Sequence, residues 1–335
     1  MKLLIVTQKV DENDDVLGFF ISWIKEFAKH CEQVELICLF EGEHNLSANV
    51  RVHSLGKERG ASKLTQLARF FYFKFFLKYD AVFVHMNPIY VCLAGDWWRL
   101  TRKRVGLFYT HRHVDFKLKM AEKFANFIFT ASESSFQLKT KKLRVVGHGI
   151  EVERFRNPGI LPVKGLVLSV GRISPIKHQD VLINALRILR EKSVDVRVKF
   201  VGAPGSLADN EYDVRLREIV EEHKLGDFVE FAGSMPNKLI AKEYWNAAVS
   251  VNLLPMGGLD KAVFESLAAG TPTVTTNQGF KQLALPGLVL CELDIDEVAK
   301  AIQIALVYPP QVDSDKISRE YSSEQVVSKI LAHYE

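Results

Sequence analysis

The sequence lacks the features of a membrane-spanning or secreted protein. None of its apolar runs reaches the ~18 residues that a bilayer-spanning helix needs. The apolar part of the N-terminus, residues 1–7, is too short for a secretory signal, and we interpret it as the first strand of a sheet. The four cysteines have no paired spacing and lie in apolar segments. We therefore expect reduced thiols, a cytoplasmic location and no zinc site.

Repeats and low-complexity segments are also absent. The first predicted strand is not followed by the G-x-G-x-x-G turn that cradles pyrophosphate in many dinucleotide-binding domains. This absence argues against a nicotinamide-dependent dehydrogenase. The 335 residues, 47% of them apolar and 25% charged, are enough to form two hydrophobic cores.

Short apolar runs alternate with helical patterns along the chain. In the first half, strands are predicted at Leu3–Val6, Val34–Leu39, Val50–Ser54, Ala81–His85, Val105–Tyr109, Phe127–Thr130 and Leu143–Val146. Helices are predicted to begin near Gly18, Ser62, Ile89, Val114 and Ser134. In the second half, strands are predicted at Leu166–Val170, Val196–Val201, Phe228–Phe231, Val249–Leu253, Thr273–Thr276 and Leu288–Cys291, with a last helix from Ser323.

This alternation predicts an α/β fold with two doubly wound parallel sheets. The strand pattern stops near residues 156–159 and starts again at Leu166, so we place the domains at 1–158 and 159–322, followed by a helix over 323–335. Ligands of such sheets bind beyond the carboxyl ends of the strands. Candidate functional residues are therefore sought in the loops that follow strands.

The most informative segment, residues 249–276, combines a strand, a glycine turn, a helix and a second strand. Backbone N–H groups at the start of that helix, over Gly258–Lys261, are suited to bind a phosphate. Glu265 lies one turn further along among apolar residues, where a carboxylate is costly unless something donates hydrogen bonds to it. Sugar hydroxyls would do so. The alternative is an ion pair with Lys261 four residues earlier.

A second segment, residues 167–189, places two cations in one loop between a strand and a helix. Arg172 follows Gly171 at the end of the strand, and Lys177 lies near the start of the helix. Arginine binds phosphate oxygens through two hydrogen bonds and lysine acts as a point charge, so the pair suits a diphosphate. A basic loop exposed to solvent is the alternative.

These two segments resemble the retaining glycosyltransferases of the GT-B fold, specifically family 4 (glycosyl transferases group 1). That family has a G-R-x(4)-K segment, matched by Gly171, Arg172 and Lys177, and an E-x(7)-E segment whose second half is matched by residues 265–272. Gly257 stands at the position of the first Glu. The resemblance implies that Glu265 holds the ribose of a nucleotide. It leaves the contact with the transferred sugar to Asp260 or to backbone N–H groups.

The resemblance also implies two Rossmann-like domains that face a cleft, with the last helix crossing back to the first domain. The implied donor-binding residues are Gly18, Gly171, Arg172, Lys177, Gly202, Met235, Gly258, Leu259, Asp260, Lys261 and Glu265. His111, Arg172 and Lys177 are the implied catalytic residues, and His113 is the alternative to His111. No Asp-x-Asp metal motif occurs where a donor would lie, so we expect neither a metal nor a cofactor.

Charge is distributed unevenly. Residues 51–150 contain 19 Lys and Arg against 6 Asp and Glu, although the net charge of the chain is only +4. Residues 63–78 combine many phenylalanines with Lys and Arg, and residues 97–104 combine two tryptophans with four cations. These segments suit a peripheral contact with an anionic membrane. A buried aromatic helix face with a solvated basic rim is the alternative. No nucleic-acid recognition motif accompanies the charge.

The predicted activity is transfer of a hexose from a nucleotide diphosphate sugar to an acceptor hydroxyl with retention of configuration. The expected acceptor is a glycan or lipid-linked molecule of the cell envelope. The alternative is a GT-B protein that binds nucleotide sugars but has lost turnover, because the first Glu of the family motif is missing.

Overall fold

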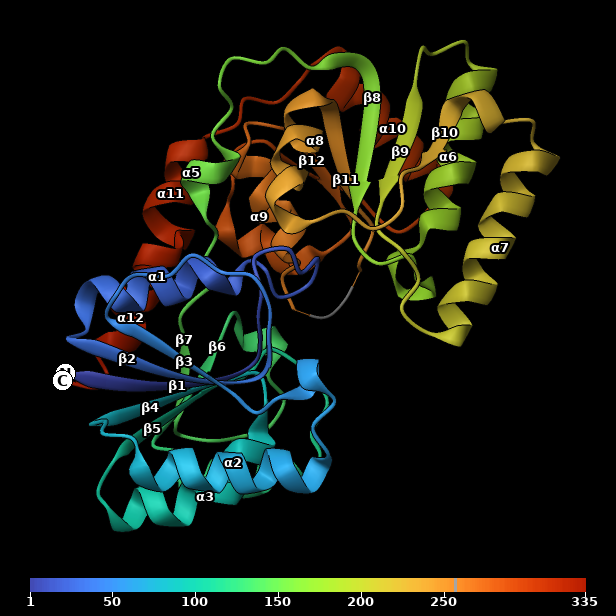
Figure 1. The fold of residues 1–335 in the computed structure, drawn as a ribbon. Helices are drawn as coiled ribbons and strands as arrows, with labels where there is room; N and C mark the ends of the chain where they lie inside the picture. Colours follow the sequence, from blue (N-terminus) through green and yellow to red (C-terminus); the bar gives the residue numbers. More distant parts are fainter. Residues whose placement is uncertain (256–257) are drawn as a thin grey trace. The chain divides into compact units, whose positions relative to one another are not determined.

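The computed structural model describes residues 1–255 and 258–335, and it divides the chain into two compact units (Figure 1). The first unit contains residues 1–149 and 321–335, and the second contains residues 150–320. Both are built on a parallel sheet with helices on its two faces, as the alternation of elements predicts.

The first unit has a seven-stranded sheet in the order β3-β2-β1-β4-β5-β6-β7. Its strands are β1 (Lys2–Val10), β2 (Gln33–Glu41), β3 (Val50–Ser54), β4 (Ala81–His85), β5 (Arg104–Phe108), β6 (Phe127–Thr130) and β7 (Leu143–Val145). All neighbouring pairs are parallel. The strand order reverses between β1 and β4, and in sheets of this kind ligands bind next to such a reversal.

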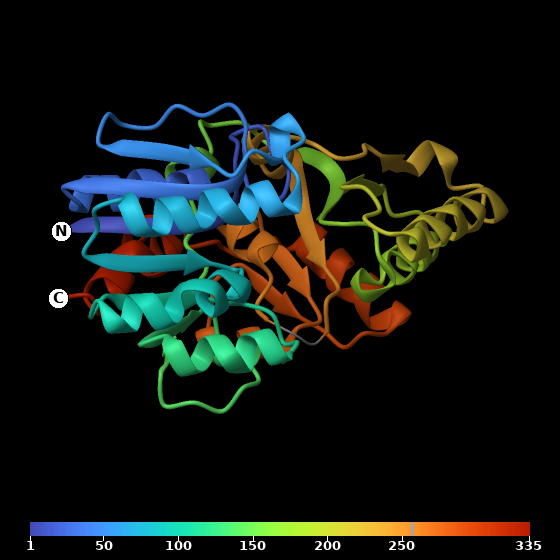
Figure 2. The ribbon, with the colours of Figure 1, turned by 60° about the horizontal axis from the view of Figure 1, so that its bottom comes forward.

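Helices cover both faces of this sheet (Figures 1 and 2). α1 (Phe20–His30) and α12 (Ser323–Leu331) pack on one face, and α2 (Lys63–Phe76), α3 (Pro88–Leu100) and α4 (Phe116–Phe124) lie on the other. In α1, Phe20, Trp23, Ile24 and Phe27 recur with helical spacing and are all buried. Both chain termini lie at the same end of this unit.

The last helix belongs to the first unit. In α12, Val326, Val327 and Ile330 are fully buried in the core that α1 also lines. Just beyond the helix, the Tyr334 hydroxyl donates a 2.7 Å hydrogen bond to the Val82 carbonyl in β4. The hydroxyl lies so close to Gly106 that a Cβ there would be 2.3 Å from it. The sheet therefore needs glycine in β5 to accommodate the end of the chain.

The second unit has a six-stranded parallel sheet in the order β10-β9-β8-β11-β12-β13. Its strands are β8 (Val163–Val170), β9 (Arg197–Val201), β10 (Val229–Phe231), β11 (Ala247–Asn252), β12 (Thr273–Thr275) and β13 (Leu288–Leu290). Its helices are α5 (Val152–Phe155), α6 (Gln179–Glu191), α7 (Leu207–Glu222), α8 (Ile240–Asn246), α9 (Lys261–Ala268), α10 (Ile295–Val307) and α11 (Ser314–Tyr321).

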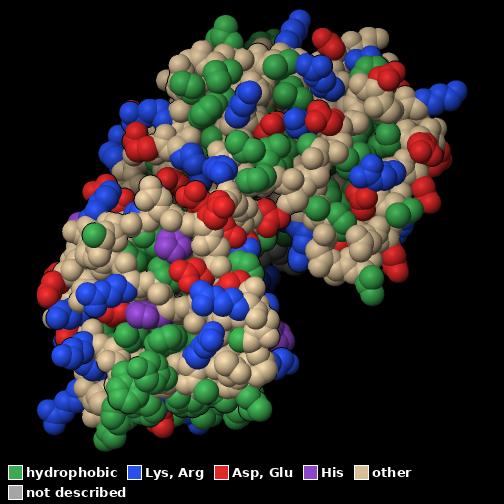
Figure 3. All heavy atoms as spheres, in the orientation of Figure 1, with side chains coloured by type: hydrophobic (Ala, Val, Ile, Leu, Met, Phe, Trp, Pro, Cys, Tyr) green, Lys and Arg blue, Asp and Glu red, His purple; other side chains and the backbone are tan. Residues whose placement is uncertain are grey.

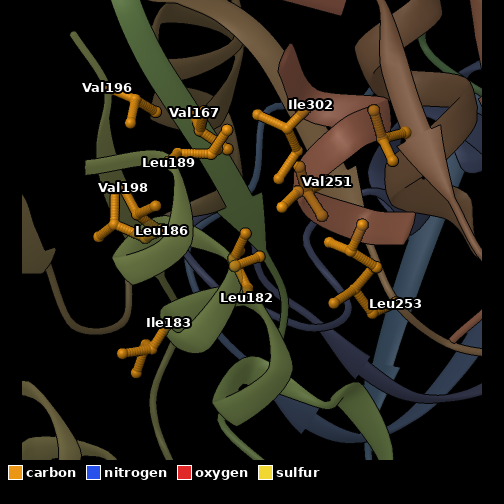
Figure 4. Close-up of a cluster of buried hydrophobic side chains, with 14 of the residues drawn as sticks. Val167, Leu182, Ile183, Leu186, Leu189, Val196, Val198, Val251, Leu253 and Ile302 are labelled. Carbon is orange, nitrogen blue, oxygen red and sulfur yellow. The ribbon is translucent and has the colours of Figure 1, made fainter. Parts of the chain in front are cut away.

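The core of the second unit lies between this sheet and helices α6, α7 and α10 (Figure 4). Leu182, Leu186 and Leu189 of α6 recur at intervals of three and four residues and point at Val167 and Val198 in the sheet. The same core includes Val251 of β11 and Ile302 of α10. This packing fixes the positions at which the strands end and their loops begin.

The predicted fold class is confirmed, and several strands have the predicted bounds, because short β-branched runs between turn residues leave few other structures open. The helix predicted from Ser134 is wrong. Only a single 3-10 turn, Glu133–Ser135, forms there. The Ser132 hydroxyl bonds to the hydroxyls of Ser134 (3.0 Å) and Ser135 (2.7 Å), and such local side-chain bonds compete with helix formation.

The connection between the units packs on the second one. Phe155 is fully buried, with its ring 5.9 Å from that of Tyr244, and its carbonyl accepts a 2.7 Å hydrogen bond from Trp245 Nε1. These contacts explain why residues 150–158 belong to the second unit, whereas the sequence analysis counts them with the first domain.

We expect Ile330→Ala in α12 to lower the free energy of unfolding of the first unit by about 2–5 kcal/mol, since it leaves a cavity in a fully buried site. Leu100→Ala, on a helical residue of the same unit that is 76% exposed, is the matched control. Urea denaturation followed by tryptophan fluorescence measures both, because Trp23, Trp97 and Trp98 report on the first unit. Equal losses in the two variants would contradict the assignment of α12 to the core.

Candidate functional site

Three loops of the second unit meet at the carboxyl edge of its sheet. The Gly171 N–H, after β8, donates to the Val201 carbonyl of β9 (2.9 Å). The Gly202 N–H, after β9, donates to the Gly233 carbonyl in the loop that follows β10 (2.8 Å). That loop also carries Met235. The predicted residues Gly171, Gly202 and Met235 therefore lie in adjacent loops at one edge.

Backbone packing explains why Gly171 and Gly202 are glycines. Their φ angles are +143° and +144°, a region that side chains disfavour. A Cβ on Gly202 would lie 2.0 Å from the Gly171 carbonyl oxygen, and a Cβ on Gly171 would lie 3.6 Å from Lys177 Nζ. The first glycine thus leaves space beside the lysine ammonium.

A buried glutamine fixes the basic loop after β8. Gln179 Nε2 donates to the Arg172 carbonyl (3.0 Å), and Gln179 Oε1 accepts from the Ser174 N–H (3.5 Å). The Arg172 side chain is 59% exposed, and its Nε lies 3.7 Å from a carboxylate oxygen of Asp209. Hydrogen bonds from Ser174 and Ser206 hold the pKa of Asp209 below its usual range, with a smaller contribution from Arg172. Arg172 is therefore an exposed cation beside a carboxylate that stays ionised.

Lys177 and Asp260 form an ion pair that joins the basic loop to the start of α9. Asp260 also accepts a 2.8 Å hydrogen bond from Asn252 Nδ2, at the end of β11, and a 3.2 Å bond from the Ala262 N–H, which caps α9. Burial alone would raise the pKa of Asp260, but the Lys177 ammonium and these hydrogen bonds lower it to about 2. Asp260 therefore stays ionised at physiological pH.

Glu265 is 5% exposed and lies one turn into α9. Its Oε1 is 3.2 Å from Lys261 Nζ. The ion pair with Lys261, which the sequence analysis gives as the alternative to sugar hydroxyls, is therefore present. Its Oε2 is 3.5 Å from the Tyr244 hydroxyl in α8. Burial lowers the pKa of Lys261, although Glu265 opposes this shift, and burial together with Glu265 raises the pKa of Tyr244 well above 10. The carboxylate is thus held by a cation and a neutral phenol.

A further cation, Arg154 of α5, lies near this pair. Its guanidinium is 3.0 Å from the Glu151 carboxylate and 4.7 Å from the centre of the Phe155 ring. Its charge contributes to the lowered pKa of Lys261.

Four neighbours of the site were missed in the sequence analysis: Arg154, Asp209, Tyr244 and Asn252. Asn252 could have been found, because it is a polar residue at the end of an otherwise apolar strand. The other three are distant in sequence from the motifs and follow no spacing that would single them out.

Gly258 and Leu259 precede the cap of α9. The Gly258 carbonyl accepts a 3.3 Å hydrogen bond from Asn277 Nδ2, and the Leu259 side chain is 7% exposed. Gly257, at the position of the first Glu of the family motif, lies outside the described residues.

The remaining predicted residues, Gly18 and His111, lie in the first unit. Gly18 is buried in the turn before α1, where its N–H donates to the Asp14 carbonyl (3.2 Å). His111 is exposed in the loop after β5, with its ring edge-on to Tyr109 at 5.6 Å. The Tyr109 hydroxyl donates to the His113 carbonyl (3.1 Å) and thereby shapes that loop. Contacts of Gly18 and His111 with a donor stay predictions.

Neither a cluster of metal ligands nor a membrane-spanning helix occurs among the described residues. They include no group of three or more His, Cys, Asp or Glu side chains placed to hold a metal ion. Among the same residues, no helix is long and apolar enough to cross a bilayer.

Residues 164–307 match the family model described as glycosyl transferases group 1. The putative colanic acid biosynthesis glycosyltransferase WcaL of Escherichia coli (strain K12) is 29% identical over 192 residues, which are 53% of this chain and 44% of that protein. The D-inositol 3-phosphate glycosyltransferase of Acidothermus cellulolyticus is 31% identical over 152 residues, which are 41% of this chain and 34% of that protein. The chain thus matches less than half the length of these curated relatives.

Solved structures resemble the whole chain. Anabaena Alr3699/HepE, in complex with UDP and glucose, superposes with a TM-score of 0.75 at 15% identity over 99% of both chains. Sucrose-phosphate synthase from Thermosynechococcus elongatus gives a TM-score of 0.76 at 16% identity over 99% of this chain and 98% of that one. At these identities the likeness establishes the fold.

Two Rossmann-like units define a protein of the GT-B class. Its second unit carries the match to the group 1 glycosyltransferases, the family that the sequence resembles. The family resemblance drawn from the sequence is confirmed.

We expect Lys261→Met to lower the free energy of unfolding of the second unit by about 3 kcal/mol, because it leaves the buried Glu265 carboxylate without its cation. The control is Lys300→Met, which removes an exposed pair with Glu297 and should cost less than about 1 kcal/mol. Urea denaturation compares the two. Equal stability of the two variants would mean that the Lys261–Glu265 pair contributes nothing to the fold.

Proposed function

We propose that this protein transfers a hexose from a nucleotide diphosphate sugar to an acceptor hydroxyl, with retention of configuration and without a metal ion. The observation that carries the proposal is the grouping of Arg172, Lys177 and the start of α9 at one sheet edge, with the buried Glu265 one turn further along. Anion-binding groups and a hydroxyl-binding carboxylate are thus near each other, as a nucleotide diphosphate requires.

The cations suit the diphosphate. Lys177 lies beside the N-terminus of α9, where the helix dipole also favours an anion. Arg172 is largely exposed, so it can turn toward a ligand at little cost in buried contacts. Negative charge develops on the diphosphate as the bond to the sugar breaks. These two cations stabilise that charge electrostatically, which is the role that a divalent ion plays in other transferases.

Glu265 suits the ribose. One of its oxygens pairs with Lys261 and the other is 3.5 Å from the Tyr244 hydroxyl, a weak contact that leaves lone pairs for ribose hydroxyls. The loop that carries Met235 lies at the same sheet edge and is proposed to meet the base through its backbone. We propose further that His111 and Gly18 of the first unit contact the transferred sugar and the donor phosphates.

The chemistry proposed here involves no enzymic nucleophile. The acceptor oxygen attacks the anomeric carbon on the face from which the diphosphate leaves, and the departing phosphate oxygen accepts the acceptor proton. Relatives support this class of reaction: WcaL is named as a glycosyltransferase of colanic acid biosynthesis, and HepE was solved with UDP and glucose. We propose that the acceptor is a cell-envelope glycan or glycolipid and that the enzyme acts in the cytoplasm.

A second candidate function is binding of nucleotide sugars without efficient turnover. Two observations favour it. Lys177, one of the two proposed catalytic cations, is already paired with Asp260, and Gly257 stands where the family motif has its first Glu. Product analysis with a panel of sugar nucleotides separates the two functions. An enzyme releases nucleoside diphosphate during transfer or slow hydrolysis, whereas a binding protein returns the intact donor.

We expect Glu265→Gln to weaken nucleoside diphosphate binding by about tenfold to a hundredfold, since it removes charge-assisted hydrogen bonds worth ~1.5–3 kcal/mol. Isothermal titration with UDP, GDP and ADP identifies the bound nucleotide and then measures the change. Glu297→Gln, on an exposed face of α10, is the matched control.

If the Glu265→Gln variant bound the nucleotide with the parent's affinity, the proposed ribose contact would be wrong, and Glu265 would only pair with Lys261. Circular dichroism of each variant excludes unfolding as the cause of weak binding.

We expect Arg172→Ala and Lys177→Ala each to lower kcat by about 100-fold or more with the fold intact, because each removes charge that stabilises the leaving diphosphate. Turnover is measured with EDTA present, where the parent should keep its activity. Lys192→Ala, on an exposed residue at the end of α6, should leave kcat unchanged.

Loss of parental activity in EDTA with rescue by manganese or magnesium would contradict the metal-free mechanism. Unchanged turnover in both cation variants would reject the proposed diphosphate site.

A further inference from the structure

Helix α2 of the first unit exposes most of its apolar side chains. Of its fourteen residues, only Phe70 and Lys74 are buried. Five large apolar side chains of α2 are exposed: Leu64 (79%), Leu67 (37%), Tyr72 (58%), Phe75 (48%) and Phe76 (70%). The space-filling view has a broad hydrophobic patch over α2 and α3 (Figure 3). Apolar patches of this kind on soluble domains commonly mark interaction surfaces.

The aromatic side chains of this patch support one another. The Phe75 ring meets Trp97 of α3 edge-on at 4.9 Å, and the Tyr72 and Phe76 rings are 4.7 Å apart. Lys74 Nζ lies 4.7 Å from the centre of the Phe71 ring and 4.5 Å from that of Phe75. Burial lowers the pKa of Lys74. The rings are therefore already ordered, so a partner would not have to order them.

Cations border the patch. One surface hollow is lined by Lys74, Phe75, Lys78, Trp97 and Lys103, and its lining also includes Lys2 and one carboxylate, Asp80. A second hollow, of about 430 Å³, is lined by Arg99, Arg102, Lys103, Arg104, Lys123 and Lys142, with no Asp or Glu in its lining. The hollows share Lys103. Aromatic face and basic rim thus form one continuous surface, which we call the α2 surface.

We propose that the α2 surface docks the protein on an anionic lipid bilayer, with the exposed side chains of α2 entering the headgroup region and the rim cations binding lipid phosphates. Apolar residues flanked by Lys and Arg are the combination that anionic membranes bind. This inference goes beyond the proposed sugar transfer and does not depend on it.

Two other occupants fit less well. In a symmetric dimer the same surface faces itself, so the rim cations of both copies would be brought together and repel. Single-stranded nucleic acid would stack its bases on the aromatic rings, but Leu64 and Leu67 make up much of the exposed area at the start of α2 and offer no ring to stack on. Acyl chains and anionic headgroups use both parts of the surface.

Cosedimentation with vesicles tests the proposal. The full chain is mixed with vesicles of pure phosphatidylcholine or of phosphatidylcholine with about 30–40% phosphatidylglycerol. Each mixture is measured at low and at high salt. We expect binding to the anionic vesicles, weaker binding as salt rises, and little binding to pure phosphatidylcholine. Leu64→Ser with Phe76→Ser should lower the apparent partition coefficient about tenfold or more. Arg102→Gln with Arg104→Gln should lower it similarly and reduce its salt dependence.

Matched controls come from the second unit. Leu161→Ser with Leu207→Ser changes side chains that are 85% and 83% exposed, and Lys192→Gln with Arg215→Gln removes two exposed cations. Both controls should bind like the parent, and circular dichroism should give the same melting curve for all variants.

The proposal is overturned if the parent does not sediment with anionic vesicles, or if it binds phosphatidylcholine equally well at all salt concentrations. It is also overturned if the α2 variants bind like the controls. Analytical ultracentrifugation tests self-association. If the protein does not bind vesicles but forms a dimer that Leu64→Ser with Phe76→Ser abolishes, the surface is a dimer interface. Failure of nucleotide binding or sugar transfer has no bearing on these outcomes.

Discussion

The ion pair between Lys177 and Asp260 is the contact on which the geometry of the candidate site depends. It joins the loop after β8 to the N-terminal cap of α9, and Asn252 connects both to the end of β11. Three separate segments thus share one carboxylate. Because a buried carboxylate is costly without donors, each of these groups restrains the others, and the start of α9 cannot move without disturbing the basic loop.

The cations of the site have acidic partners within the chain. Lys177 pairs with Asp260, Lys261 with Glu265, and Arg172 lies near Asp209. An anionic ligand would therefore compete with carboxylates already in place. The exposed Arg172 can exchange partners most easily, whereas the other two pairs are less exposed and resist exchange. Affinity would depend on how completely the ligand replaces these internal contacts.

The sequence predicts the layered architecture well, because apolar runs between turn residues specify strands and the alternation with helices specifies a parallel sheet. It also predicts the loop that carries Arg172 and Lys177 and the helix that carries Glu265. The partners of these residues were harder to predict. Lys177 and Asp260 are 83 residues apart, and Tyr244 and Glu265 come from different helices. The sequence offers Asp260 as a contact for the transferred sugar. Its role as the cap of α9 was not predicted, because that role depends on the exact residue at which the helix begins.

The position of α12 has a consequence for synthesis of the chain on the ribosome. The first unit begins with residue 1, but its core is closed by a helix near the end of the chain. Trp23 and Phe27 of α1 lie in the core that Val326 and Ile330 complete, so this apolar surface stays uncovered while the whole second unit is translated. The second unit, which is continuous in sequence, has all of its residues available earlier. The N-terminal unit is therefore completed after the second unit, and its nascent form exposes apolar core surface for longer.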